Sequence, residues 1–319
     1  MRDRALVVLG PTATGKTSLA LELSRIRRIE VISLDSALVY RGMDIGTAKP
    51  SREELGLCPH HLIDIRDPAE SYSAADFRQD CLRLVPEICA RGALPVICGG
   101  TMMYYKALCE GLSPLPKTDP AVRARVAAEA EKLGWPAMHA RLREIDPPLY
   151  GKLAPNDRQR VSRALEVYEM TGRPLSSFYG QKGEGCPFLR AEIVLLPSDG
   201  REELRVQIRR RFMKMLGDGL LDEVASLRER GGLSLSLPSM RAVGYRQAWE
   251  HLEGRTTYEQ MVEQAVIATA RLAKHQMTWL RGGLSEDGCL KRVVMRPSDP
   301  GCAAAALELA ESLDQAASA

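Results

Sequence analysis

The fold is constrained most by one octapeptide near the start of the chain, Gly10-Pro11-Thr12-Ala13-Thr14-Gly15-Lys16-Thr17. It has the pattern G-x-x-x-x-G-K-[ST] and lies between an apolar, strand-like run at 4–9 and a helical pattern at 18–23. In that setting the glycines let the backbone wrap an anion, and the helix adds its positive N-terminal end. Lys16 supplies a positive charge, and Thr17 supplies a hydroxyl suited to Mg²⁺. The sequence therefore predicts that residues 10–17 bind a phosphate or diphosphate.

The rest of the sequence does not match an ATP-driven motor. In such an enzyme an apolar strand ends in an aspartate that holds Mg²⁺. The best candidate strand, at 94–98, continues instead into Gly99-Gly100-Thr101. The diphosphate is therefore predicted to belong to a substrate rather than to an energy source.

Strand and helix patterns alternate over the first hundred residues, which favours a parallel sheet with helices on both faces. Ligands of such sheets bind at the carboxyl ends of the strands, where Asp35-Ser36 and Gly100-Thr101 are predicted to join residues 10–17 in one crevice. The expected elements are strands at 30–34, 61–65, 94–98, 191–197 and 291–295, helices at 73–90, 201–216, 218–230 and 256–281, and a frayed alanine-rich helix at the end.

From about residue 112 the pattern changes to helices broken by Pro and Gly. The prediction is an α/β fold with a P-loop NTPase-like parallel sheet core, formed by residues 1–116 and 191–319. A helical insertion domain is expected at 117–190. The core segment 1–116 holds 14 Lys or Arg and 14 Asp or Glu, whereas 117–182 holds 12 and 8, and 201–282 holds 14 and 10. Both later segments therefore hold more basic than acidic residues. This surplus of positive charge indicates either ordinary solvated helix faces or contact with a polyanion.

Composition narrows the class of protein further. The mean hydropathy is −0.19, and no apolar run approaches the ~18 residues of a membrane span. The eight cysteines form no pair or Cys/His cluster at zinc spacing. We therefore expect a cytoplasmic protein without a signal peptide, membrane contact or structural zinc.

Several landmarks together resemble the bacterial tRNA dimethylallyltransferase family, over about residues 5–282. They are Gly10–Thr17, Asp35-Ser36, Tyr40–Pro50, Gly99-Gly100-Thr101, Pro155–Arg160, Arg163–Glu166 and Val243–Gln247. One position departs from the family pattern, since Leu38 stands where many members carry Gln. The resemblance implies transfer of the dimethylallyl group of dimethylallyl diphosphate to N6 of the adenosine 3′ of the anticodon, with Mg²⁺ required and diphosphate released.

The resemblance also assigns contacts and partners. It implies binding of the tRNA anticodon stem-loop, and we expect the protein to act as a monomer. In the core, the implied RNA contacts are Asp35, Ser36, Ala37, Leu38, Thr101, Met240, Arg241, Ala242, Val243, Gly244, Tyr245, Lys274, Gln276 and Trp279. In the insertion, they are Arg123, Gln159, Arg160, Val161, Ser162 and Arg163. A core anchor of the last long helix is an alternative role for Trp279.

The chemistry of prenyl transfer fits these residue types. An exocyclic adenine amine is a poor nucleophile, and Asp35 at a strand end is the expected base that accepts its proton. The departing diphosphate gains charge, which Lys16, the loop N–H groups and Mg²⁺ on Thr17 would stabilise. Thr101 is expected to touch the reacting centre. The alternatives are a turn or N-cap aspartate and a turn hydroxyl.

Three other functions remain compatible with the sequence. A P-loop small-molecule kinase would share the phosphate loop and the Asp-bearing second strand. A prenyltransferase acting on free adenine nucleotides would share the core but leave the basic insertion without a purpose. A nucleotide-gated RNA-binding module without chemistry would not require Asp35 and Thr101 at one crevice.

Overall fold

Six parallel strands form the sheet at the centre of the chain, in the order β3-β2-β4-β1-β5-β6. Their bounds are β1 Arg4–Leu9, β2 Ile29–Leu34, β3 His60–His61, β4 Leu94–Gly99, β5 Leu189–Leu195 and β6 Cys289–Met295. The computed structural model describes residues 2–180, 183–197, 201–282 and 284–319, apart from the side chains of 201–203. Strands buried on both faces read as continuous apolar runs, as β1 does. The predicted α/β fold is confirmed.

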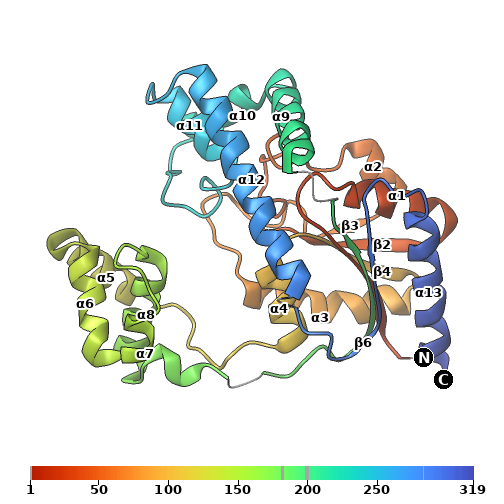
Figure 1. Cartoon of the computed structure of the whole chain (residues 1–319), viewed down its shortest axis with the longest axis horizontal. Helices are drawn as coiled ribbons and strands as arrows, with labels where there is room; N and C mark the ends of the chain where they lie inside the picture. Colours follow the sequence, from red (N-terminus) through yellow and green to blue (C-terminus); the bar gives the residue numbers. More distant parts are fainter. Residues whose placement is uncertain (1, 181–182, 198–200, 283) are drawn as a thin grey trace. The chain divides into compact units, whose positions relative to one another are not determined.

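Helices cover both faces of the sheet (Figure 1). Alternate residues of β1 point to opposite faces, so Leu6 and Val8 pack with α1 (Lys16–Ile26) and α13 (Cys302–Ser318). Ala5, Val7 and Leu9 pack in a second core with α3 (Ala74–Ala90) and α4 (Met102–Glu110). The remaining helices of this part of the chain are α2 Arg52–Leu57, α9 Arg201–Gly217, α10 Leu220–Glu229, α11 Tyr245–Leu252 and α12 Tyr258–Gly282. None of the helices in the described ranges is long and apolar enough to cross a membrane.

Two expected elements were wrong in their details. The strand expected at 61–65 ends at His61, because Leu62 and Asp64 have positive φ angles of 64° and 56° that an extended strand cannot contain. The alanine-rich tail is a packed helix rather than a frayed one. Its Ala306, Leu309 and Leu313 are buried against the sheet, because small side chains let the helix approach closely.

Contacts divide the chain into two compact units, Met1–Cys109 with Cys186–Ala319, and Glu110–Gly185. The predicted boundaries were 117 and 190, but Leu189 and Arg190 already pair with β1 and so belong to the core sheet. The second unit contains helices α5 Pro120–Leu133, α6 Trp135–Ile145, α7 Pro147–Tyr150 and α8 Arg158–Thr171, with a 3₁₀ turn at Leu175–Phe178. It has its own apolar core around Val126, Met138 and Leu165.

Candidate active site

The carboxyl ends of β1, β2 and β4 open into a cavity of about 930 Å³. Residues 12–18, 35–38 and 98–103 line it, together with parts of α9, α12 and the segment 238–245. All these residues belong to the unit that holds the sheet. The two parallel pairings, β1 with β4 and β2 with β4, bring the three strand ends to one edge. The structure thus brings together the three segments that the sequence placed in one crevice.

The phosphate loop, residues 10–17, is held by its own contacts. Gly15 has φ 72°, which a glycine adopts without strain at the start of α1. Thr14 Oγ1 and Lys16 Nζ both donate to the Pro11 carbonyl, at 2.8 and 2.7 Å. Burial lowers the pKa of Lys16, while nearby Cys98 and Asp35 oppose that shift. A cation that is poorly hydrated in a cavity is well suited to bind a phosphate.

Asp35 and Thr101 lie at neighbouring strand ends. The Ser36 N–H donates to Thr101 Oγ1 at 3.0 Å, and the N–H groups of Gly100 and Thr101 donate to the Leu34 carbonyl at 3.1 Å. Asp35 Oδ1 accepts from the Ala37 N–H at 2.8 Å, so Asp35 does organise a turn. Its other carboxylate oxygen makes no hydrogen bond to the described residues and remains available as an acceptor in the cavity.

Gly99 is required where these strand ends meet. A Cβ at this position would lie 2.2 Å from the Leu34 carbonyl oxygen, closer than any side chain tolerates. Glycine therefore lets β2 and β4 approach closely enough for Thr101 to reach Ser36.

Arg211 of α9 also lines the cavity, and the sequence analysis missed it. Desolvation lowers the pKa of its guanidinium, and the neighbouring Asp35 opposes the shift. No hydrogen bond or ion pair joins Arg211 to another residue in the described ranges. The helical pattern of the sequence could have identified Arg211. Ile208, Phe212 and Met215 are buried and mark the inward face of α9, and Arg211 lies on that face.

The core residues predicted to contact RNA differ in their surroundings. Arg241 to Tyr245 line the cavity, as does Trp279, which is partly buried and has Lys106 Nζ 5.4 Å above its ring centre. Met240 is fully buried and does not line the cavity, so its side chain is not available to RNA. Lys274 is exposed on α12.

Gln276 has a different environment from the one expected of an RNA contact. Its Oε1 accepts from the Thr12 N–H at 3.0 Å, and its Nε2 donates to the Gly100 carbonyl at 2.9 Å. The side chain of Gln276 therefore links the phosphate loop to the end of β4.

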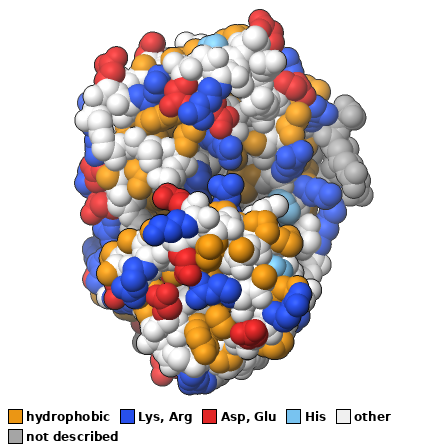
Figure 2. Space-filling view, turned by 90° about the vertical axis from the view of Figure 1, so that its left-hand side faces the viewer, with side chains coloured by type: hydrophobic (Ala, Val, Ile, Leu, Met, Phe, Trp, Pro, Cys, Tyr) orange, Lys and Arg blue, Asp and Glu red, His pale blue; other side chains and the backbone are white. Residues whose placement is uncertain are grey.

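Five of the six predicted contacts of the helical unit lie in the first two turns of α8, and Arg123 lies on α5. Gln159 and Arg160 are exposed, and Arg160 forms an ion pair with Asp157 at 3.1 Å. Val161 is fully buried and cannot offer its side chain to RNA. Lys and Arg side chains are interspersed with acidic ones on the face shown in Figure 2.

Buried Glu166 organises the remaining basic contacts of this unit. Its Oε1 accepts from Ser162 Oγ at 2.8 Å and lies 3.4 Å from Arg123 Nε. Arg163 donates to the Pro116 carbonyl at 2.8 Å and lies 3.8 Å from Glu166. These contacts restrict the orientation of Arg123 and Arg163.

A metal ion would have few protein ligands here. No group of three or more His, Cys, Asp or Glu side chains that could hold a metal occurs in the part of the chain that the structure describes. Thr17 is exposed, lines the cavity and has no hydrogen-bond partner for its hydroxyl among the described residues. One hydroxyl beside a phosphate loop fits Mg²⁺, which binds mainly through waters and substrate phosphates.

The chain matches a family model, curated relatives and a solved structure. Residues 38–283 match the family model described as IPP transferase. The chain is 57% identical over 277 residues to the tRNA dimethylallyltransferase of Burkholderia thailandensis, with 86% of each chain covered. It is 51% identical over 291 residues to tRNA dimethylallyltransferase 2 of Hahella chejuensis, with 87% of each covered. The crystal structure of a tRNA isopentenylpyrophosphate transferase from Bacillus halodurans matches with a TM-score of 0.69, 34% identity and 98% of each chain covered.

Proposed function

The chain belongs to the IPP transferase family, and we infer that it is an enzyme that prenylates tRNA. We propose dimethylallyl diphosphate as the donor and N6 of the adenosine 3′ of the anticodon as the acceptor. The observation that carries this proposal is the shared cavity: a phosphate loop faces an acceptor carboxylate, Asp35, across the ends of three strands. A phosphate loop alone would fit many enzymes, whereas this pairing fits transfer from a diphosphate to a weakly nucleophilic amine.

The donor diphosphate is held by residues 10–17 in this proposal. The loop N–H groups and the start of α1 favour an anion, and Lys16 and Arg211, which both line the cavity, add positive charge. Bound Mg²⁺, with Thr17 as its protein ligand, would neutralise charge that develops on the leaving diphosphate. Because Lys16 and Arg211 are already desolvated, their attraction to the diphosphate is stronger than it would be in water.

The acceptor amine is activated by Asp35. The N6 lone pair attacks C1 of the dimethylallyl group, the C1–O bond breaks, and diphosphate leaves with the bonding electrons. Asp35 accepts the proton that N6 loses, through the carboxylate oxygen not used by Ala37. In this proposal Thr101, whose Oγ1 accepts a hydrogen bond from the Ser36 N–H, hydrogen-bonds with the reacting groups.

The target base must leave its stack to reach this cavity. Arg241 to Gly244 and Trp279 offer charge, backbone groups and an aromatic ring around the opening. These are the contacts by which proteins recognise unstacked bases in RNA loops. We further propose that the protein acts as a monomer in the cytoplasm, the compartment of its proposed substrate.

Mass spectrometry of tRNA nucleosides tests the proposal. Incubation of unmodified tRNA, Mg²⁺ and dimethylallyl diphosphate with the protein should produce a prenylated adenosine at the position 3′ of the anticodon. Parallel reactions with ATP and metabolites test the kinase alternative, and reactions with free adenine nucleotides test the other prenyltransferase. A product only in one of those parallel reactions would overturn the proposal.

A further inference from the structure

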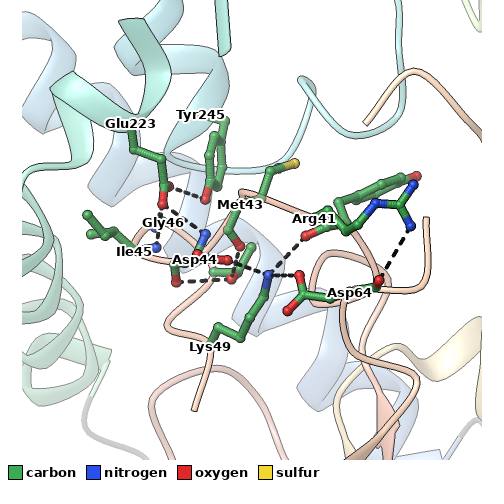
Figure 3. Close-up of polar contacts among 11 residues, drawn as sticks. Arg41, Met43, Asp44, Ile45, Gly46, Lys49, Asp64, Glu223 and Tyr245 are labelled. Atoms are coloured by element: carbon green, nitrogen blue, oxygen red, sulfur yellow. Dashed lines mark hydrogen bonds and ion pairs between the residues drawn. The ribbon is translucent and has the colours of Figure 1, made fainter. Parts of the chain in front are cut away.

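One carboxylate outside the cavity collects four hydrogen bonds from two segments that line the cavity (Figure 3). Glu223 Oε2 accepts from the N–H groups of Asp44 and Ile45, both at 2.8 Å. Glu223 Oε1 accepts from the Gly46 N–H at 3.3 Å and from the Tyr245 hydroxyl at 2.5 Å. All four partners are donors, so a carboxylate with acceptors at both oxygens satisfies them, whereas an amide at the same place would not.

The same segment is held a second time by Lys49. The Lys49 side chain is only 5% exposed, and its Nζ donates to the Tyr40 carbonyl at 2.9 Å and to the carboxylates of Asp44 and Asp64. Residues 43–49 are therefore fixed at one end by Glu223 and at the other by Lys49 (Figure 3). A segment with two charged anchors loses little further freedom when a substrate arrives.

Gly46 packs directly against Tyr245. A Cβ at Gly46 would lie 2.4 Å from Tyr245 Cε2 and 2.8 Å from Leu220 Cδ1. The loop backbone thus lies against the aromatic ring without room for a methyl group. Any shift of Tyr245 must displace residues 44–46, and the reverse also holds.

The two segments that Glu223 joins lie side by side in the cavity lining. Gly46 to Lys49 belong to the segment after β2, and Arg241 to Tyr245 belong to the segment before α11. Glu223 itself is not among the lining residues. Both of its carboxylate oxygens already accept hydrogen bonds from these two segments, so we expect Glu223 to act through the segments that it holds.

We propose that Glu223 is a positioning residue for prenyl transfer, which sets the distance between residues 46–49 and 241–245 around the target base. This inference rests on the proposed function. A base and a donor must meet in a near-attack geometry, and a displacement of about 1 Å is enough to lower the rate about 10²-fold. The rate of the chemical step is therefore the quantity that Glu223 controls.

Glu223→Gln is the primary variant, because it keeps the size of the side chain and turns one acceptor into a donor. Glu229→Gln is the matched control, since Glu229 lies on the same helix, is exposed and forms no hydrogen bond or ion pair through its side chain with the described residues. Single-turnover transfer is measured with saturating tRNA and dimethylallyl diphosphate. We expect a fall of roughly 10- to 100-fold for Glu223→Gln and a change within about twofold for Glu229→Gln.

Hydrogen exchange gives a readout that does not depend on prenyl transfer. The N–H groups of Asp44, Ile45 and Gly46 should be protected in the parent protein, exchange faster in Glu223→Gln and remain protected in Tyr245→Phe. In a double-mutant cycle, Tyr245→Phe should add little to the rate defect of Glu223→Gln, because the hydroxyl contributes through the same carboxylate.

Two results with Glu223→Gln would overturn the inference. One is a Glu223→Gln rate within about twofold of the parent together with a lower melting temperature, which would make Glu223 a stabilising residue only. The other is unchanged exchange at residues 44–46 in Glu223→Gln. If that variant fails to fold, an unaltered single-turnover rate in Tyr245→Phe overturns the inference. Absence of transfer by the parent protein would refute the proposed function instead, and the exchange data would still decide whether Glu223 positions the segment.

Discussion

Replacing Gln276 with alanine should weaken binding of the prenyl donor much more than binding of tRNA. In the structure both ends of the Gln276 amide are used inside the protein, on the Thr12 N–H and on the Gly100 carbonyl. The variant would leave the phosphate loop without its link to the end of β4. The loop would then be less ordered before the donor arrives, and donor binding would have to order it.

The size of the effect follows from the two lost hydrogen bonds. Each neutral hydrogen bond contributes about 0.5–1.5 kcal/mol net, and Gln276 is only half-buried, so water can replace part of this. A combined loss of about 1–2 kcal/mol corresponds to a roughly 5- to 30-fold higher Kd for dimethylallyl diphosphate. The melting temperature of Gln276→Ala should also fall slightly, because the two lost hydrogen bonds, to Thr12 and Gly100, lie within the folded protein.

Calorimetric titration with the donor and fluorescence anisotropy with an anticodon stem-loop separate the two substrates. Lys274→Ala is the matched control, since Lys274 is exposed on the same helix and should affect RNA rather than the donor. If Gln276→Ala raised the Kd for RNA more than the Kd for the donor, Gln276 would be a direct RNA contact, and the reasoning from its two hydrogen bonds would be wrong.

Three further predictions concern other parts of the chain. Asp35→Asn should lower single-turnover transfer by about 10²–10⁴-fold while both substrates still bind; a rate near that of the parent would exclude Asp35 as the base. Arg160→Ala should reduce the slope of log K for the stem-loop against log salt by roughly 1, because its exposed guanidinium would meet a phosphate, and an unchanged slope would contradict that contact. Arg91 hydrogen-bonds Glu30 and lowers the pKa of Glu30 below its ordinary 4.5, so this stabilisation is complete above about pH 4.5 and is lost as pH falls through the lowered value. Thermal melts should therefore show Glu30→Gln less stable than the parent at pH 7, with the gap closing in acid; a gap independent of pH would refute the assignment.

Local patterns were sufficient for most of the core. The phosphate loop is defined by the spacing of its glycines and Lys16, and the apolar runs at 4–9 and 94–98 were correctly predicted as buried strands. A strand that must end at Asp35 also predicted which edge of the sheet would hold the site. These features depend on residues close together in sequence, so the sequence alone determined them.

The tertiary structure decided the features that depend on distant residues. The sequence of α9 contains three successive arginines, and helical phase puts Arg211 on the inward face, but only the tertiary structure showed that this face lines the cavity. The roles of Gln276 and Glu223 depend on partners 264 and 177–179 residues away, which no local pattern specifies. The physical reason is that a side-chain hydrogen bond requires two groups to be close in space but not close in sequence. Folding therefore has to bring both partners together before either has a role.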